Sequence, residues 1–246
     1  MRKSVAACRM FAICLFMAAY LVIVGIPVLT YCRLISNPKL ALRLTRLLDR
    51  IILFLAGISV EIEGLEKIPK SGCVLVGNHR SIVDVTAVFL DLPVDIRFLG
   101  KKELFHIPLV SYALSTMGMI PVDRSNPEAA AKSIDLAVSV LKDGKSFVLF
   151  PEGTRSRSGE LLPFKKGAFV LAIKAQVPVV PFTMFGAAEA LRPDTPFLYP
   201  GKVRIVIHDP ISTQGMDLEQ RNLLLQKARG MIEQSLRDRA QPDMVS

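Results

Sequence analysis

The sequence predicts an α/β protein in which a mixed, largely parallel sheet is covered by helices and preceded by an N-terminal membrane-associated segment of two helices. From residue 60 onward, short apolar runs of strand length alternate with stretches of helical periodicity. This alternation is typical of a sheet buried on both faces. Before residue 60 the chain is strongly apolar or basic. A length of 246 residues fits one domain of ordinary size with an appendage.

The first expected element is an apolar helix over residues 11–32, a stretch without charged residues. At about 1.5 Å per residue it would be about 33 Å long, close to the ~30 Å hydrocarbon core of a bilayer. A spanning helix, a buried core helix and a cleaved signal peptide would all show such a run. Cleavage is disfavoured because the run is too long, no Ala-x-Ala-like site follows, and Tyr31 precedes Cys32.

The second expected element is a basic amphipathic helix over residues 38–57. Leucine and isoleucine recur there at helical spacing, and a row of cations repeats beside them: Lys39, Arg43, Arg46 and Arg50. Such a helix lies at an anionic bilayer surface with its apolar stripe in the acyl region. A helix docked on a domain would carry a similar stripe, but the neighbouring apolar sequence favours the membrane. We therefore expect a membrane-associated unit over residues 1–58 and a separate α/β domain over residues 59–246.

The distribution of charge points to a membrane partner rather than to nucleic acid. Of the formal net charge of +9, the first fifty residues supply eight basic and one acidic side chain. The chain has no tryptophan, and its basic residues are not interleaved with aromatic ones, as a base-stacking surface would require. More Lys and Arg follow residues 11–32 than precede them, which predicts that the domain over residues 59–246 lies on the cytoplasmic side of the inner membrane. The four cysteines lack disulfide or zinc spacing, so no metal is expected.

The elements of the second domain follow from its apolar runs and helix signals. The expected strands cover residues 60–62, 73–76, 96–99, 119–122, 147–150, 179–184 and 203–207. The expected helices cover residues 127–141, 165–175 and 218–236. Asn126 can cap the first of these helices, and Gly144 lies just past its end.

A histidine and an aspartate five residues apart, His79 and Asp84, follow the strand expected over residues 73–76. An imidazole can take a proton from an alcohol near neutral pH, and a carboxylate on its other nitrogen fixes the tautomer and stabilises the imidazolium. Five is not the spacing of one helical face. We therefore expect His79 at a strand end and Asp84 in the first turn of the next helix.

A second motif, Phe150 to Ser156, directly follows the apolar residues 147–149 and reads Phe-Pro-Glu-Gly-Thr-Arg-Ser. Its glycine allows close approach to a ligand, and the planar fork of its arginine suits a phosphate. Ligands of open α/β sheets bind beyond the carboxyl ends of strands. His79 and residues 152–155 all follow expected strands, so we expect them to converge on one pocket.

Together these blocks resemble the glycerolipid acyltransferase family, which carries a His-x4-Asp motif and a Glu-Gly-Thr-Arg block. Residues 118–124, Gly-Met-Ile-Pro-Val-Asp-Arg, resemble the family's acceptor-binding segment, and residues 177–182, Val-Pro-Val-Val-Pro-Phe, resemble its valine-proline strand. The order and separation of all four blocks match. The resemblance covers roughly residues 60–210 and is closest to the bacterial 1-acylglycerol-3-phosphate acyltransferases.

The resemblance implies direct acyl transfer from acyl-coenzyme A or acyl carrier protein to the sn-2 hydroxyl of 1-acylglycerol-3-phosphate, giving phosphatidic acid. It implies no metal and no other cofactor. His79 would be the catalytic base and Asp84 its orienting carboxylate. The residues expected to bind substrate are Lys101, Arg124, Glu152, Gly153, Thr154 and Arg155. Whether Lys101 or its neighbour Lys102 is the family's lysine stays open.

Several alternatives remain. Another lysolipid, such as lyso-ornithine lipid, fits the same motifs. Ser81 could be an acyl-carrying nucleophile, although the chain has no Gly-x-Ser-x-Gly elbow. A non-catalytic membrane lipid-binding protein would use His79 and Asp84 as a structural pair. His106 and His208 lack partners at useful spacing. Lys165 and Lys166 could line the site or begin a solvated helix.

Overall fold

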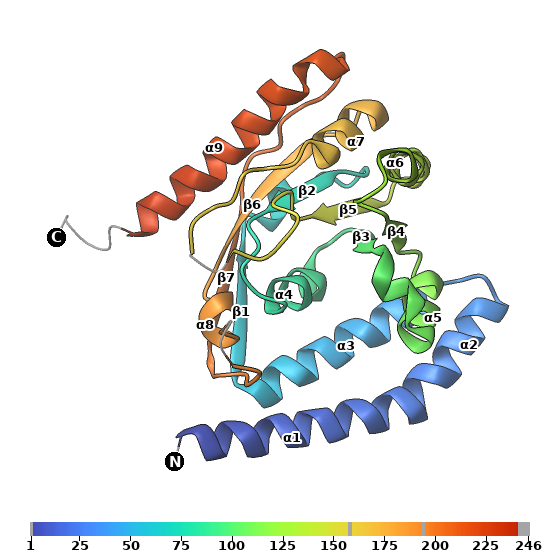
Figure 1. Ribbon diagram of the computed structural model, residues 1–246, viewed down its shortest axis with the longest axis vertical. Helices are drawn as coiled ribbons and strands as arrows, with labels where there is room; N and C mark the ends of the chain where they lie inside the picture. Colours follow the sequence, from blue (N-terminus) through green and yellow to red (C-terminus); the bar gives the residue numbers. More distant parts are fainter. Residues whose placement is uncertain (1, 157–158, 193–194, 241–246) are drawn as a thin grey trace.

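The computed structural model describes residues 2–156, 159–192 and 195–240. Within these residues a seven-stranded sheet has the order β1-β7-β6-β2-β5-β3-β4 (Figure 1). All seven expected strands are confirmed to within about two residues at each end. They are β1 Ile58–Glu63, β2 Val74–Gly77, β3 Ile96–Lys101, β4 Ile120–Val122, β5 Ser146–Leu149, β6 Val179–Phe185 and β7 Gly201–Ile207.

The sheet is mixed and largely parallel, as the sequence predicts. Every neighbouring pair of strands is parallel except β6 and β7, which are antiparallel. The strands β6, β2, β5, β3 and β4 therefore all run in one direction. As a result, the carboxyl ends of β2, β5, β3 and β4 lie along the same edge of the sheet, and the loops that leave them are neighbours.

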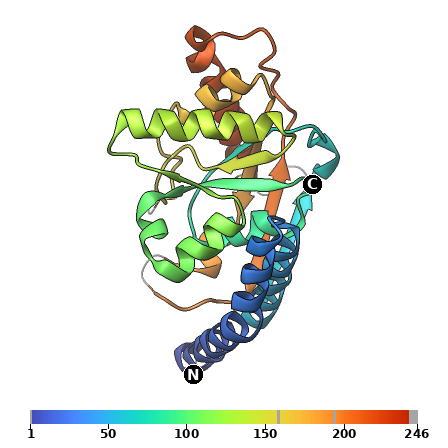
Figure 2. The ribbon, with the colours of Figure 1, turned by 90° about the vertical axis from the view of Figure 1, so that its right-hand side faces the viewer.

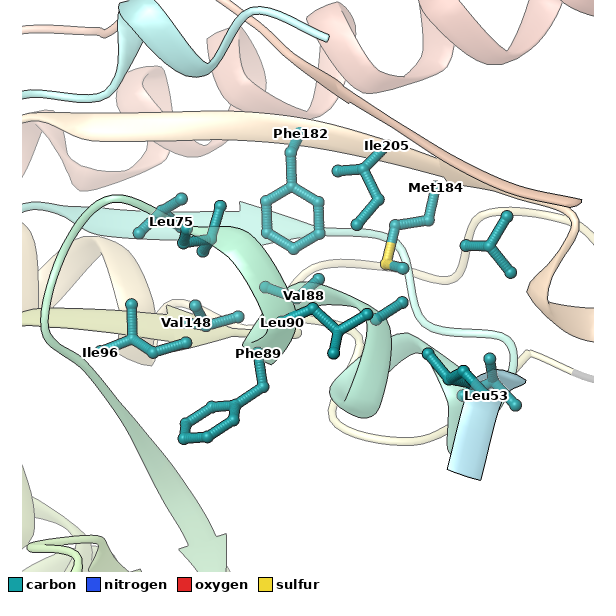
Figure 3. Close-up of a cluster of buried hydrophobic side chains, with 14 of the residues drawn as sticks. Leu53, Leu75, Val88, Phe89, Leu90, Ile96, Val148, Phe182, Met184 and Ile205 are labelled. Atoms are coloured by element: carbon teal, nitrogen blue, oxygen red, sulfur yellow. The ribbon is translucent and has the colours of Figure 1, made fainter. Parts of the chain in front are cut away.

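Helices cover both faces of the sheet (Figure 1). One face carries α6 Pro127–Lys142, α7 Gly167–Ala175 and α9 Arg221–Ala240, and the other carries α4 Val83–Asp91 and α8 Ala187–Ala190. Figure 3 shows the core on the α4 side, where Val88 and Leu90 face Phe182 and other side chains of the sheet. This core fixes α4, and with it the start of the helix that follows His79.

The expected capping of α6 is confirmed. The Asn126 side chain accepts a hydrogen bond from the Ala129 backbone N–H at 3.1 Å, and Gly144 has a φ of +80° just after the helix. Other helix boundaries differ from expectation. α7 begins two residues late, and α9 follows a 3-10 turn, Leu218–Gln220, capped by Asp217. α5 Pro108–Thr116 and α8 were not expected.

The N-terminal segment is a long helix followed by a second helix antiparallel to it. α1 Arg2–Tyr20 continues through a π-helical turn, η1 Leu21–Gly25, into α2 Ile26–Leu34. The expected apolar helix is thus confirmed, although it begins before residue 11. Residues 5–34 are long and apolar enough to cross a membrane. α3 Lys39–Ala56 matches the expected amphipathic helix to within about one residue at each end.

Three polar contacts tie the long helix to the rest of the protein. Arg9 donates to the Ala56 carbonyl at the end of α3 (3.2 Å), and the Tyr20 hydroxyl donates to the Leu44 carbonyl (3.0 Å). Near the other end, the Tyr112 hydroxyl of α5 donates to Thr30 (3.3 Å). Figure 2 shows α1 and α3 side by side. The N-terminal helices share a core with the sheet, and the division at residue 58 stays a prediction.

Candidate active site

Six of the eight expected site residues line one cavity at the carboxyl edge of the sheet. The cavity measures about 600 Å³. Each of the six follows or ends one of four strands: His79 follows β2, Lys101 ends β3, Arg124 follows β4, and the other three follow β5. The six residues are His79, Lys101, Arg124, Gly153, Thr154 and Arg155. Asp84 and Glu152 are buried behind the cavity wall instead.

The His79 imidazole is held by Asp84, as the spacing predicts. Nδ1 lies 2.8 Å from Asp84 Oδ2, and Asp84 is in the first turn of α4. Because a carboxylate only accepts hydrogen bonds, Nδ1 carries the proton and Nε2 carries the free lone pair. The ring also stacks on Phe150, with centroids 4.3 Å apart. His79 therefore presents an unprotonated nitrogen from a fixed ring that lines the cavity.

Asp84 is only 1% exposed, and its Oδ2 accepts three hydrogen bonds. Besides His79, the backbone N–H groups of Arg80 (2.6 Å) and Ser81 (2.8 Å) donate to it. Oδ1 has no hydrogen-bond partner among the described residues. The loop between β2 and α4 thus wraps around one carboxylate oxygen, which fixes both the loop and the imidazole.

The backbone of His79 is clamped by the loop that follows β5. Its N–H donates to Glu152 Oε1 (2.7 Å), and its carbonyl accepts from the Ser156 N–H (2.8 Å). One residue earlier, the Asn78 side chain exchanges two hydrogen bonds with the backbone of Met184 on β6. Three neighbouring strands therefore fix the position of His79.

The structure corrects the expected position of Glu152. It is 3% exposed and does not line the cavity. Oε1 accepts from His79 N–H, and Oε2 accepts from the Leu162 N–H at 2.9 Å. Burial raises the pKa of Glu152, although both backbone bonds oppose that shift. A carboxylate so occupied by backbone donors favours a positioning role for Glu152 over contact with substrate.

Replacing Glu152 by glutamine should damage both stability and turnover. The new NH₂ group would face one of two backbone donors and leave a buried N–H unpaired, a cost of about 1–3 kcal/mol. We expect a melting temperature lower by several degrees and a kcat lower by at least about tenfold, because His79 is displaced. Glu66→Gln, at an exposed position, is the matched control. A wild-type melting temperature and kcat in Glu152→Gln would contradict the positioning role.

Four cations line the cavity, and none of the described lining residues is acidic. Three are expected: Lys101, Arg124 and Arg155. The fourth is Lys165, whose role the sequence leaves open. Arg124 donates to the Gly153 carbonyl, which ties the loop after β4 to the loop after β5. Uncompensated positive charge in a partly enclosed site favours an anionic ligand.

The structure distinguishes the two adjacent lysines at the end of β3. Lys101 lines the cavity and lies 3.7 Å from Glu103, with both side chains more than half exposed. Such an exposed pair is weak. Lys102 instead donates to Asp123 at 2.6 Å, and this hydrogen bond raises the pKa of Lys102 and lowers that of Asp123. Lys101 is therefore the lysine available to a ligand.

Most of the cavity wall is apolar. The side chains come from β3, from β4 and β5, and from α5 and α6: Phe98, Leu99, Leu114, Val122, Ile134 and Leu149. Cations and His79 share this one space with the apolar side chains. Such a cavity fits an amphiphile that has an anionic headgroup and a hydrocarbon chain.

The other candidate residues do not line the cavity. Ser81 is 1% exposed and does not line the cavity, so it is poorly placed to attack a substrate. The His208 Nε2 is 2.8 Å from the Thr183 hydroxyl, and burial lowers the pKa of His208. His106 is exposed in a 3-10 turn. Among the described residues, no three or more His, Cys, Asp or Glu side chains are arranged to hold a metal ion.

Two features of the site could not be settled from the sequence: the stacking of Phe150 on His79 and the position of Lys165. The stacking of Phe150 on His79 depends on how two loops meet, and a phenylalanine at a strand end resembles any core residue. Lys165 reaches the cavity because its backbone N–H donates to the Pro151 carbonyl at 2.8 Å. Neither contact has a local sequence pattern that would predict it.

This combination of fold and site agrees with comparisons to known proteins. The family model described as Acyltransferase matches residues 59–185, just over half of the chain. The matched region contains the His79 and Asp84 pair, the four cations and the loops that position them. The chain belongs to this acyltransferase family.

Within the family, the chain is similar to 1-acyl-sn-glycerol-3-phosphate acyltransferases. A chloroplastic one from Brassica napus is 39% identical over 72% of this chain and 50% of that protein. One from Limnanthes douglasii is 34% identical over 76% of this chain and 68% of that protein. The crystal structure of the enzyme PlsC from Thermotoga maritima is 26% identical, with a TM-score of 0.83 over the full length of both chains. The chain spans about half the length of the Brassica napus protein and of a chloroplastic relative from Arabidopsis thaliana.

Proposed function

We propose that the protein transfers a fatty acyl group from an acyl thioester to the sn-2 hydroxyl of 1-acyl-sn-glycerol-3-phosphate, giving phosphatidic acid. One observation carries this proposal: the His79–Asp84 pair opens onto an apolar cavity lined by four cations. The names of the similar proteins support the same acceptor. The reaction requires a base, an anion site and space for hydrocarbon, and this cavity combines all three.

In the proposed mechanism, His79 Nε2 removes the proton from the hydroxyl as the oxygen attacks the thioester carbonyl. The new C–O bond forms, and the tetrahedral intermediate collapses with cleavage of the C–S bond. The thiolate then takes the proton from the imidazolium. Asp84 holds the ring and stabilises its charged form through the 2.8 Å contact with Nδ1. Neither a covalent enzyme intermediate nor a cofactor is part of the proposal.

The phosphate of the acceptor would be held by Lys101, Arg124 and Arg155. Arginine binds phosphate through two parallel donors, which orients as well as attracts it. Holding the phosphate places the adjacent hydroxyl near Nε2, and such positioning accounts for a large share of the rate of reactions of this kind. The donor would be acyl-coenzyme A or acyl carrier protein, since both present the same thioester.

The N-terminal apolar helix supports association with a membrane. We propose that α1, α2 and α3 lie in one leaflet on the cytoplasmic side of the inner membrane. Polar contacts hold the long helix along α3 and α5 instead of leaving it free to cross. Large apolar side chains on these helices remain exposed: Phe11, Leu15, Ile23, Leu34 and Phe54. A lysolipid could then reach the cavity without leaving the membrane.

The function is tested with purified protein in detergent, oleoyl-coenzyme A and a panel of lysolipids, with His79→Ala assayed in parallel. Phosphatidic acid should form from lysophosphatidic acid with wild type and not with His79→Ala. Product from lyso-ornithine lipid or another lysolipid alone would replace the proposed acceptor. If neither oleoyl-coenzyme A nor oleoyl acyl carrier protein yields product with any acceptor, the chain is a lipid-binding protein rather than an enzyme.

A further inference from the structure

Lys165 lies on the cavity wall but outside the four sequence blocks that carry the family resemblance. It ends the loop before α7, and its backbone N–H donates to the Pro151 carbonyl at 2.8 Å. Its side chain runs over Gly153. A Cβ atom built on Gly153 would lie 2.9 Å from Lys165 Nζ, 3.0 Å from Cε and 3.1 Å from Cδ. The ammonium group is therefore held against the glycine of the Glu-Gly-Thr-Arg block.

Gly153 is the centre of a group of three cations. Lys165 covers its Cα, Arg124 donates to its carbonyl, and Arg155 is two residues further along. No ion pair joins Lys165 or Arg155 to a carboxylate in the described part of the chain. Gly153 has a φ of +73°, and any side chain there would displace the lysine. Lys165 and Arg155 thus have no ion pair among the described residues, and Arg124 donates to a carbonyl. The three cations around Gly153 therefore form a site for a multiply charged anion.

We propose that Lys165 is a binding residue for the phosphate of the lysolipid acceptor and acts together with Arg124 and Arg155. This inference rests on the proposed function. A phosphomonoester offers three oxygens and up to two negative charges, which matches several convergent cations. The backbone tie to Pro151 and the contact with Gly153 place the charge of Lys165 in the same cavity as His79.

The short distance between phosphate and hydroxyl favours the acceptor over the thioester donor as the ligand of Lys165. In the acceptor, only two carbons separate the reacting oxygen from the phosphate ester oxygen. In the donor, a pantetheine arm of about four residue lengths separates the thioester sulfur from its phosphate, about 14 Å when extended. A cation that shares a cavity with His79 is therefore better placed for the acceptor phosphate.

The test compares Lys165→Met, Lys165→Arg and Lys166→Met. Lys166 is the matched control, because it is adjacent and exposed but does not line the cavity. Lys165→Met should raise the KM for lysophosphatidic acid about 10- to 100-fold, the loss expected for one hydrogen bond to a charged group. The KM for oleoyl-coenzyme A and the melting temperature should change little. Lys165→Arg should recover most of the affinity, and Lys166→Met should resemble wild type.

A larger rise in the KM for oleoyl-coenzyme A than for lysophosphatidic acid would overturn the proposal and assign Lys165 to the donor. Unchanged constants in Lys165→Met would also overturn it. Binding of lysophosphatidic acid to protein in nanodiscs, measured without thioester, separates this result from failure of the proposed function. If wild type forms no phosphatidic acid, weaker binding to Lys165→Met still supports the site, and equal binding to both proteins refutes it.

Discussion

Replacing His79 by alanine is expected to lower kcat about 10²- to 10⁴-fold, while the KM for lysophosphatidic acid changes little. The reason is that Nε2 is the free nitrogen of a ring whose Nδ1 is bonded to Asp84. Without the ring, the hydroxyl must lose its proton to water. The cations that bind the phosphate remain, so acceptor affinity should be retained. Steady-state kinetics over a range of acceptor concentrations separate the two constants.

His106→Ala is the matched control for this experiment, because it removes another imidazole from an exposed turn. It should retain wild-type kcat. The melting temperature of His79→Ala must stay close to that of wild type for the kinetic result to be meaningful. More than about a tenth of wild-type kcat in His79→Ala would contradict general-base catalysis at this residue.

Replacing Asp84 by asparagine should lower kcat by a similar factor, about 10²- to 10⁴-fold, although the shape of the side chain is retained. The amide oxygen can accept from His79, Arg80 and Ser81 in place of Oδ2, but it is neutral and stabilises the imidazolium poorly. The amide NH₂ would then occupy the buried position of Oδ1, which has no hydrogen-bond partner among the described residues. We therefore also expect a loss of about 1–3 kcal/mol in the free energy of unfolding.

Asp91→Asn provides the control for Asp84→Asn, because Asp91 lies in the last turn of the same helix and forms an exposed ion pair with Arg50. Its kcat should stay within about twofold of wild type. Thermal unfolding and kcat are measured for both variants. An Asp84→Asn enzyme with kcat above about a third of wild type would show that the carboxylate charge is not needed.

The strands could be predicted from the sequence because each is a short apolar run bounded by turn residues. The strand order could not, because the pairing of β1 with β7 and the reversal between β6 and β7 join segments far apart in the chain. α6 was predicted almost to its ends by Asn126 and Gly144. α5 was missed because its nine residues have no fully buried stripe and no side-chain N-cap. Local signals thus locate elements but not their partners.

The same limit applies to the site. Local spacing was enough to pair His79 with Asp84 and to place cations at strand ends. Glu152 was expected among the substrate-binding residues because the family resemblance implies that role. Its actual partners are backbone N–H groups of residues 79 and 162, which only the folded loops bring within reach. The contact of Lys165 with Gly153 is of the same kind.

The π-helical turn η1 in the long N-terminal helix has a consequence for how α1 is aligned with α3. A π turn bonds residue i to i+5 and so takes up one more residue than an α turn. If Leu21–Gly25 were wound as a regular α-helix without loss of a residue, α1 would be rotated by about 100° relative to α2. Arg9 and Tyr20 would then turn away from α3. The π turn therefore keeps Arg9 and Tyr20 on the side of the long helix that faces α3.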